Sequence, residues 1–564
     1  MLKALHTTIK NLRPDSPKIR QKSPKWTFFS MAIALLISIP ILTVVFSIFT
    51  PAGEVWSHLA DTVLDDYVFN SLILISGVSF GVIVLGVSSA WLITMTDFTG
   101  RKVFEWASIL PFAIPAYLIA YIYTDFLDIA GPLQAMIRNL FGLSLGEYWF
   151  PNIRSVEGAI IIMSLAFYPY VYMLARSSFL EQSTSLLEAS RIMGYSTWQS
   201  FFKVAIPVAR PGIAAGLALA LMETLNDFGT VEYFGVQTFT TGIYRTWFGL
   251  GERPAAAQLA AFLLSFIVVL LILERWSRNK ISNEKANSSR FKRLNRFELK
   301  GFKSLAAFTV CFIPVLIGFI LPVILLVEMF FSNLGHLNFK FIELSFNSFT
   351  VSALTGFLAV AMALVMAYSA RLNPTRSVKF FNRVSSLGYA IPGSVIAVGV
   401  LIPFGYFDNS IDSFFREYLG FSSGLLLSGT IFAMVFAYLV RFLSVSIGGV
   451  EASMEKITPN MDEAARGMGY RFSKVLRSIH IPMMSGGLLT AGLLVFVDVM
   501  KELPATLIVR PFNFDTLAVH VYRYASDERL AESAGAALMI VLVGIIPVII
   551  INRTIARSRK SETQ

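Results

Sequence analysis

The chain contains about twelve apolar runs that are each long enough to cross a lipid bilayer. A bilayer core of ~30 Å requires about 20 consecutive apolar residues in one helix. Only 15% of the 564 residues are charged, whereas a soluble domain usually carries about 25% charged residues. The sequence therefore predicts an all-α, polytopic membrane protein. The expected spans are 27–50, 68–95, 105–127, 157–178, 208–228, 255–274, 304–331, 348–370, 384–405, 423–443, 484–508 and 533–552.

The distribution of basic residues predicts how these spans are oriented. Lys and Arg concentrate in the cytoplasmic loops of membrane proteins. If the N-terminus is cytoplasmic and the spans alternate, 37 of the 47 Lys and Arg residues fall on the cytoplasmic side, including all those in 441–482. We therefore expect an even number of spans with both termini in the cytoplasm. The first apolar run is about 24 residues long, which exceeds the ~7–15 residues of a cleavable signal, so we expect it to remain as a helix.

An internal repeat divides the chain into two similar blocks, offset by about 275 residues. A block of six spans returns to the side of the membrane where it began, so the repeats are expected to be parallel. The matched landmarks are Asn70-Ser71 with Asn347-Ser348, Ile114-Pro115 with Ile391-Pro392, Gly194 with Gly469, and Pro207 with Pro482. The predicted organisation is a basic N-terminal segment (1–25), a first six-helix block (26–276), a basic cytoplasmic linker (277–303), a second six-helix block (304–553) and a C-terminal tail (554–564).

Two patterned loops lie at matching positions on the predicted cytoplasmic side. The first loop reads EASRIMGYSTWQSFFKVAIP (Glu188–Pro207), and the second reads EAARGMGYRFSKVLRSIHIP (Glu463–Pro482). Glycine permits a turn that other residues resist, and proline is tolerated at the start of a helix. Each loop is therefore expected to form a short helix, a turn and a second short helix. The apolar side chains of the second helices (Trp198, Phe201 and Phe202; Phe472, Val475 and Leu476) suggest a docking surface.

The spacing of these loops resembles the EAA motif of permeases from binding-protein-dependent ABC importers. The resemblance covers nearly the whole chain and narrows to the fused, two-block permeases of ferric-iron importers, which it resembles in Met222–Gly249 and Asp498–Glu532. It implies that the loops are coupling helices for two copies of an ATPase subunit. The residues that match the motif are Glu188, Ala189, Gly194 and Pro207 in the first loop, and Glu463, Ala464, Gly469 and Pro482 in the second.

The resemblance implies a transmembrane permease subunit in a bacterial cytoplasmic (inner) membrane, supplied by a periplasmic or extracellular substrate-binding protein. A permease for thiamine or another small solute is one alternative, because such permeases share the loops. An ion-gradient-driven secondary carrier is another, because it too has two parallel six-span halves. The paired loops distinguish the importer from a carrier, which does not need them.

Several functional classes lack support in the sequence. No G-x-x-x-x-G-K-[ST] motif occurs, so ATP hydrolysis is expected on a separate subunit, and the permease itself is not expected to be an enzyme. The five histidines are scattered without an H-E-x-x-H motif, and His480 is expected at the surface. We predict no cofactor, no definite metal site and no nucleic-acid partner. We attribute the net charge of +11 to the basic residues that set the orientation of the chain in the membrane.

Four carboxylates lie within predicted spans. Glu223 and Asp227 are four residues apart, and so are Asp498 and Glu502, so that each pair lies on one helix face. Ionisable groups in a membrane are costly and usually face a cavity or a partner. The pairs are therefore candidates for lining a translocation path, where hard trivalent iron would prefer oxygen ligands. The open alternatives are internal salt bridges, with Lys501 as one partner, and an exposed surface that docks the binding protein.

Overall fold

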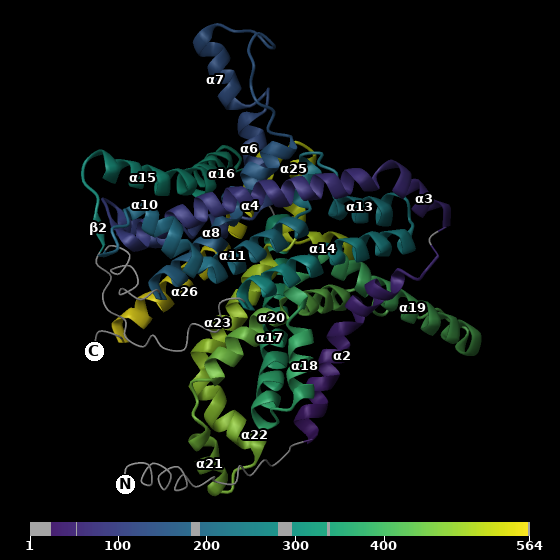
Figure 1. Cartoon of the computed structure of the whole chain (residues 1–564). Helices are drawn as coiled ribbons and strands as arrows, with labels where there is room; N and C mark the ends of the chain where they lie inside the picture. The colour runs from purple at the N-terminus through teal and green to yellow at the C-terminus, as the bar shows by residue number, and fades with distance from the viewer. Residues whose placement is uncertain (1–23, 52, 182–191, 280–295, 335–338, 562–564) are drawn as a thin grey trace, which may run out of the picture.

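The computed structural model describes residues 24–51, 53–181, 192–279, 296–334 and 339–561, which are almost entirely helical (Figure 1). Eleven helices in these ranges are long and apolar enough to cross a membrane. A twelfth candidate is a helix pair, Arg101–Ala113 and Ala116–Phe141, bent by 87°. The prediction of an all-α, polytopic membrane protein is therefore confirmed.

The first half of the chain contains fifteen helical elements within the described residues. They are α2 (Pro24–Ser47), α3 (Gly53–Thr62), α4 (Leu64–Met95), α5 (Arg101–Ala107), η1 (Leu110–Ala113), α6 (Ala116–Leu127), α7 (Pro132–Phe141), α8 (Val156–Glu181), α10 (Thr197–Ser200), η2 (Phe201–Ala205), α11 (Ile206–Asn226), α12 (Gly229–Tyr233), α13 (Phe239–Tyr244), η3 (Arg245–Gly249) and α14 (Arg253–Asn279).

The second half repeats much of this order. Its helices are α15 (Phe302–Val315), η5 (Leu316–Ile320), α16 (Leu321–Ser332), α17 (Phe339–Leu372), α18 (Arg376–Ser385), η7 (Gly388–Ala390), α19 (Gly393–Leu419), α20 (Ile431–Met454), α21 (Pro459–Gly467), α22 (Phe472–Val475), η8 (Leu476–His480), α23 (Ile481–Met500), α24 (Pro504–Val509), α25 (Leu517–Ser526), η9 (Leu530–Ser533) and α26 (Ala534–Ser561). Two short strands, β1 (Thr96–Asp97) and β2 (Phe297–Glu298), pair in parallel.

The repeat is visible in the order of the elements. The helices α10, η2, α11 and α12 begin at positions 197, 201, 206 and 229, and α22, η8, α23 and α24 each begin 275 residues later. Pro207 and Pro482 lie in the first turns of α11 and α23, where a missing backbone N–H is tolerated. In each half three long helices pack on one another, α4 with α8 and α11, and α17 with α20 and α23.

Two predicted spans are interrupted. Within the predicted spans 105–127 and 384–405, the helix breaks at Ile114-Pro115 and at Ile391-Pro392. Both isoleucines are extended, with ψ of 122° and 130°, because a residue that precedes proline is disfavoured in the helical region. The same dipeptides mark the repeat, so the break occurs at matching positions in the two halves.

The two halves are interleaved in space. The first helix, α2, packs against α17, α18 and α19, and α15 packs against α4 and α5. A Cβ built on Gly399 of α19 would lie 2.4 Å from the carbonyl oxygen of Pro40 in α2, so these two helices touch backbone to backbone. The first helix of each block therefore packs against helices of the other block. The six-helix blocks divide the sequence, but they are not separate units in space.

The two patterned loops lie at different corners of the molecule. In Figure 1, α10 lies at the left edge, whereas α21 and α22 lie at the bottom. The helix α7 projects away from both, at the top of the view, and the C-terminal end of α19 extends to the right. The two patterned loops therefore lie apart from the projecting segments, which are α7 and the C-terminal end of α19.

Candidate functional site

A cavity of about 90 Å³ lies between the two halves of the chain. The first half contributes parts of η1, α6, α8 and α11, and the second half contributes η7, α20 and the break between α23 and α24. All four predicted membrane carboxylates line this cavity. Its polar and charged lining residues are Tyr117, Tyr170, Glu223, Asn226, Asp227, Tyr389, Arg441, Asp498, Lys501 and Glu502.

Arg441 connects the acids of the two halves. Its Nη1 lies 2.9 Å from Glu502 Oε1 and donates to Asn226 Oδ1, also at 2.9 Å. Its Nη2 lies 3.6 Å from Glu223 Oε2. Only 3% of Arg441 is exposed, so these contacts are shielded from solvent and from salt. The guanidinium therefore holds α11 of the first half against α20 and Glu502 of the second.

The second cation of the cavity is Lys501, whose Nζ lies 3.1 Å from Asp498 Oδ1. The same ammonium lies 4.3 Å from the centre of the Phe112 ring, a distance at which the ring face attracts a cation. Lys501 occupies the position that matches Asn226 in the repeat. One half therefore presents an amide where the other presents an ammonium group.

Asp227 has a local structural task. Its carboxylate accepts hydrogen bonds from the backbone N–H groups of Thr230 and Val231, at 2.9 and 3.2 Å, and from the Thr230 hydroxyl at 2.9 Å. These are the free N–H groups in the first turn of α12, which a carboxylate satisfies well. Glu502, its counterpart, accepts from the Ala505 N–H at the start of α24, at 3.1 Å.

The cavity is acidic despite its two cations. Four carboxylates and two cationic side chains line it, so its formal charge is negative when all of them are ionised. The sequence left open whether the acids line a cavity or form internal salt bridges. In the structure both hold, because Arg441 and Lys501 form salt bridges with acids that also face a cavity. Among the described residues, no group of three or more His, Cys, Asp or Glu side chains is arranged to hold a metal ion.

The second patterned loop forms the expected helix, turn and helix. The helix α21 ends at Gly467, Gly469 adopts a φ of +82°, and α22 begins at Phe472. Residues with a Cβ rarely adopt this left-handed conformation. Nothing lies within 4 Å of a Cβ built on Gly469. The backbone conformation, and not a lack of space, is therefore what requires glycine here.

A partly buried network anchors this loop to two membrane helices. Asp462 of α21 lies 2.5 Å from His480 Nε2 and 2.7 Å from Arg371 Nε. Arg371, at the end of α17, also donates to the carbonyl oxygens of Met454 and Ile457, at 3.0 and 2.8 Å. Burial alone would raise the pKa of Asp462, but the hydrogen bonds and positive charges of His480 and Arg371 hold it below its ordinary value of 3.8.

The first loop is described only from residue 192 onward. Glu188 and Ala189 lie outside the described residues. Gly194 has a φ of +81°, which matches Gly469, and Pro207 begins α11 in the same way that Pro482 begins α23. The described parts of the two loops therefore share one backbone plan.

Among the described apolar side chains that the sequence pattern suggested, only some are exposed, and Phe202 is the largest of these, at 61% exposed. Phe201, Val475 and Leu476 are buried against the membrane helices, and Phe201 packs 4.8 Å from Trp91. Large apolar side chains also reach solvent at the turns, where Met193 and Met468 are 70% and 69% exposed. The matching Met-Gly-Tyr triplets in both loops were the available sequence signal for these positions.

Two further expectations were wrong. His480 was expected at the surface, but it is completely buried, because Asp462 and the ring of Tyr368, 5.3 Å away, enclose it. Arg441 was counted among the cytoplasmic loop charges, but it lies inside α20 and faces the cavity. From the sequence alone, a single arginine after an apolar run is assigned to the end of the membrane helix. Its burial becomes evident only when its acidic partners on other helices are known.

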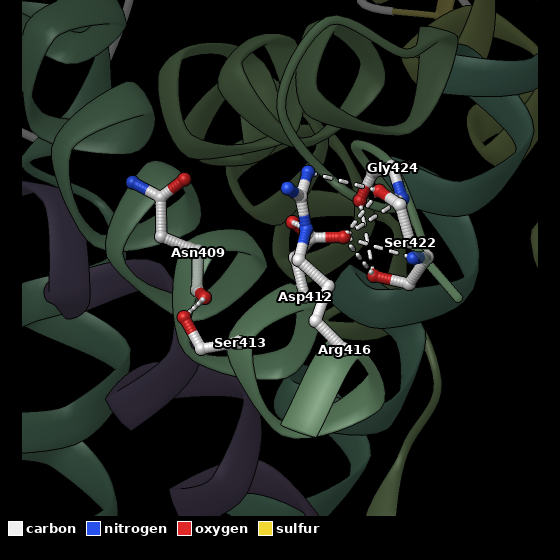
Figure 2. A network of polar contacts seen from close by, with 7 residues as sticks. Asn409, Asp412, Ser413, Arg416, Ser422 and Gly424 are labelled. Atoms are coloured by element: carbon white, nitrogen blue, oxygen red, sulfur yellow. Dashed lines mark hydrogen bonds and ion pairs between the residues drawn. The ribbon is translucent and has the colours of Figure 1, made fainter. Parts of the chain in front are cut away.

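The C-terminal end of α19 carries a separate polar network, shown in Figure 2. Asp412 accepts from the Ser422 hydroxyl at 2.5 Å and pairs with Arg416 Nε at 2.6 Å. One turn earlier, the buried Asp408 accepts from the backbone N–H groups of Leu427 and Ser428, at 2.9 and 2.7 Å. The two aspartates fix the loop 420–430 against the end of this helix.

Comparison with known families agrees with this architecture. Residues 82–283 match a family described as "Binding-protein-dependent transport system inner membrane component". This match begins within α4 and includes α8, the first patterned loop and α11. It therefore covers the first-half contributions to the cavity.

Similar proteins fall into long and short relatives. The Fe(3+)-transport system permease protein FbpB 2 of Haemophilus influenzae is 25% identical over 489 residues, which cover 86% of this chain and 89% of that protein. The molybdenum transport system permease protein ModB of Escherichia coli is 23% identical over 207 residues, 36% of this chain but 87% of that protein. The sulfate transport system permease protein CysT of Escherichia coli is 25% identical over 193 residues, 33% of this chain and 67% of that protein. The short relatives therefore align with about one block.

Proposed function

Since this chain is a permease of the binding-protein-dependent ABC importer family, resembling the fused two-block members, we propose that it carries ferric iron across the membrane. The observation that supports this cargo best is the acidic cavity between the two halves, with four carboxylates against two cations. Hard trivalent cations prefer oxygen ligands, whereas molybdate and sulfate are anions that an acidic lining repels. Similarity to the long ferric relatives points to the same cargo.

In this proposal the cavity is part of the translocation path. Glu223, Asp498 and Glu502 face it from both halves, and Tyr170 and Tyr389 approach each other across it, with their hydroxyls 3.5 Å apart. A cargo that passes here must separate the two halves locally. Because the helices break beside the cavity, at residues 227–228 and 501–503, small rotations of α12 and α24 would change its width.

Two copies of an ATPase subunit would dock on the patterned loops, from the cytoplasmic side. Exposed Met193 and Met468 would enter the ATPase surface, and the network around Asp462 would transmit movement of α21 to α17 and α23. Both termini would then also be cytoplasmic. The segments that project away from the loops, α7 and the end of α19, would face the binding protein.

The direct test is uptake by the reconstituted complex. Proteoliposomes that contain the permease, its ATPase and its binding protein should accumulate radioactive ferric iron in an ATP-dependent manner, and they should accumulate neither molybdate nor sulfate. Accumulation driven by a proton gradient without ATP would contradict the coupling. ATP-dependent uptake of an oxyanion in place of iron would contradict the cargo.

A further inference from the structure

Arg441 is a buried cation inside an acidic site that lies between the two halves. It contacts Glu223 and Asn226 from α11 and Glu502 from the second half. A buried guanidinium needs compensating acids, because its desolvation is costly. The same acids are uncompensated whenever the guanidinium leaves. The cluster of Glu223, Asn226 and Glu502 is therefore built around the positive charge of Arg441.

The repeat shows that this arginine is not needed to build a block. The helix α20 begins 275 residues after α8, so that Ala166 occupies the place of Arg441 in the first half. Ala166 also lines the cavity. Only the second block supplies a cation at this position of the repeat. This asymmetry indicates a task in the assembled pair of blocks.

The guanidinium is held tightly but is not fully satisfied. Its Nε is buried and has no hydrogen-bond partner in the part of the chain that the structure describes. Its other nitrogens depend on acids from two different halves, so any separation of the halves removes at least one of them. A buried donor without a partner weakens the net stabilisation of the bound pose.

Gly393 closes the site from a third side. Its N–H donates to Asn226 Oδ1 at 2.7 Å. A Cβ built at this position would lie 2.5 Å from Glu502 Oε1 and 2.8 Å from Arg441 Nη1. The start of α19 is therefore packed directly on the ion pair, which leaves no room for another ligand on this side of Arg441.

We propose that Arg441 is a tethered counter-cation that keeps the path closed by occupying the acidic site between the halves. When the halves separate, the guanidinium withdraws and its acids become available to a passing cation. This inference rests on the proposed function for its cargo, but the closing contact itself does not depend on which cation is carried.

Thiol labelling of the full chain in liposomes tests the closing contact. Cysteine is introduced by Ala166→Cys in a Cys311→Ser background, since the native thiol is buried. The cavity is then probed with two membrane-impermeant methanethiosulfonate reagents, one with a cationic trimethylammonium group and one with an anionic sulfonate group. With Arg441 present, both should react slowly. With Arg441→Gln, the cationic reagent should react about tenfold faster, and faster than the anionic one.

The controls separate charge from loss of folding. Arg416→Gln removes an exposed arginine from the end of α19 and should leave both rates unchanged. The pair Arg441→Gln with Glu223→Gln keeps the net charge of the site, so it tests opening in a protein without an added uncompensated acid. It should react faster with both reagents and show less preference for the cationic one.

Each outcome is decisive. Unchanged rates in both the single and the double variant would overturn the closing role of Arg441. Faster reaction with a preference for the anionic reagent would overturn the assignment of the site to cations. Labelling requires neither the ATPase nor iron, so a failure of iron uptake with the expected labelling would reject only the proposed cargo. Normal uptake with unchanged labelling would reject only the role of Arg441.

Discussion

Asp462 and His480 lie 2.5 Å apart and join the surface helix α21 to the beginning of α23. Arg371 holds the same carboxylate from α17. In the repeat, the place of His480 is taken by Ala205, so the described part of the first half has no equivalent of this contact. The second loop is therefore attached to its membrane helices through a charged contact that the described part of the first loop, from residue 192 onward, does not share.

Replacing Asp462 with Asn should loosen this attachment. Hydrogen bonds to charged groups contribute about 1.5–3 kcal/mol, and a loss in this range should lower the unfolding midpoint of the purified protein. Because the folded state holds the pKa of Asp462 below 3.8, its contribution is complete above that unfolded value. The contribution disappears as the pH falls through the lower folded value.

The difference in unfolding midpoint between the wild type and Asp462→Asn should therefore be constant at neutral and mildly acidic pH and shrink only below about pH 4. Glu455→Gln, which removes an exposed acid near the same loop, should show no such difference. A difference that grows as the pH falls would contradict the assigned role of the carboxylate.

The turn glycines offer a test of coupling. Gly194→Val and Gly469→Val place a β-branched residue at a φ near +80°, which costs at least about 1–2 kcal/mol locally. We expect each variant to insert normally but to retain less ATPase during co-purification. Gly467→Val is the matched control, since this glycine has open space and no left-handed backbone. Equal retention by Gly469→Val and the control would argue against a role for the turn.

The capping role of Asp227 separates it from the other acids of the cavity. Asp227→Asn keeps a good helix cap, whereas Asp227→Ala should lower stability by about 1 kcal/mol. Glu223 lies within α11 and caps no helix, so Glu223→Gln should leave the helix cap unchanged and instead reduce uptake. Thermal unfolding and uptake, measured on all three variants, distinguish the roles. If Asp227→Asn abolished uptake while stability stayed normal, its charge would belong to the path as well.

The sequence predicted the spans and the repeat because both depend on patterns that survive without knowledge of contacts. Apolar length predicts a span, and the matched loops predict the offset of 275 residues that the helix starts confirm. The positions of Arg441 and His480 were missed for a physical reason. Their burial depends on Glu223, Glu502 and Tyr368, which come from other helices far along the chain.

The carboxylates show where residue spacing stops being informative. Glu223 and Asp227 share one helical spacing, and this predicts a common face. However, α11 ends at Asn226, and Asp227 turns to cap the next helix. The ends of α11, at Asn226, and of α23, at Met500, lie within one residue of the same repeat position, so the break belongs to the fold of both halves and not to the acids themselves.

Gly393→Ala should disturb the Arg441 site without removing any charge. The new methyl group would lie within 3 Å of Glu502, Arg441 and the Ala505 backbone, so the ion pair must shift. Because the backbone at Ala505 cannot move as a flexible side chain does, we expect overpacking to cost about 1–3 kcal/mol. Gly405→Ala, in the same helix, meets one side-chain atom at 4.0 Å and should be neutral. Thermal unfolding gives the cost, and labelling of Ala166→Cys in the Cys311→Ser background shows whether the path has opened. A protein as stable as the control, with its cavity still closed, would show that α19 is not packed on the ion pair as tightly as the distances require.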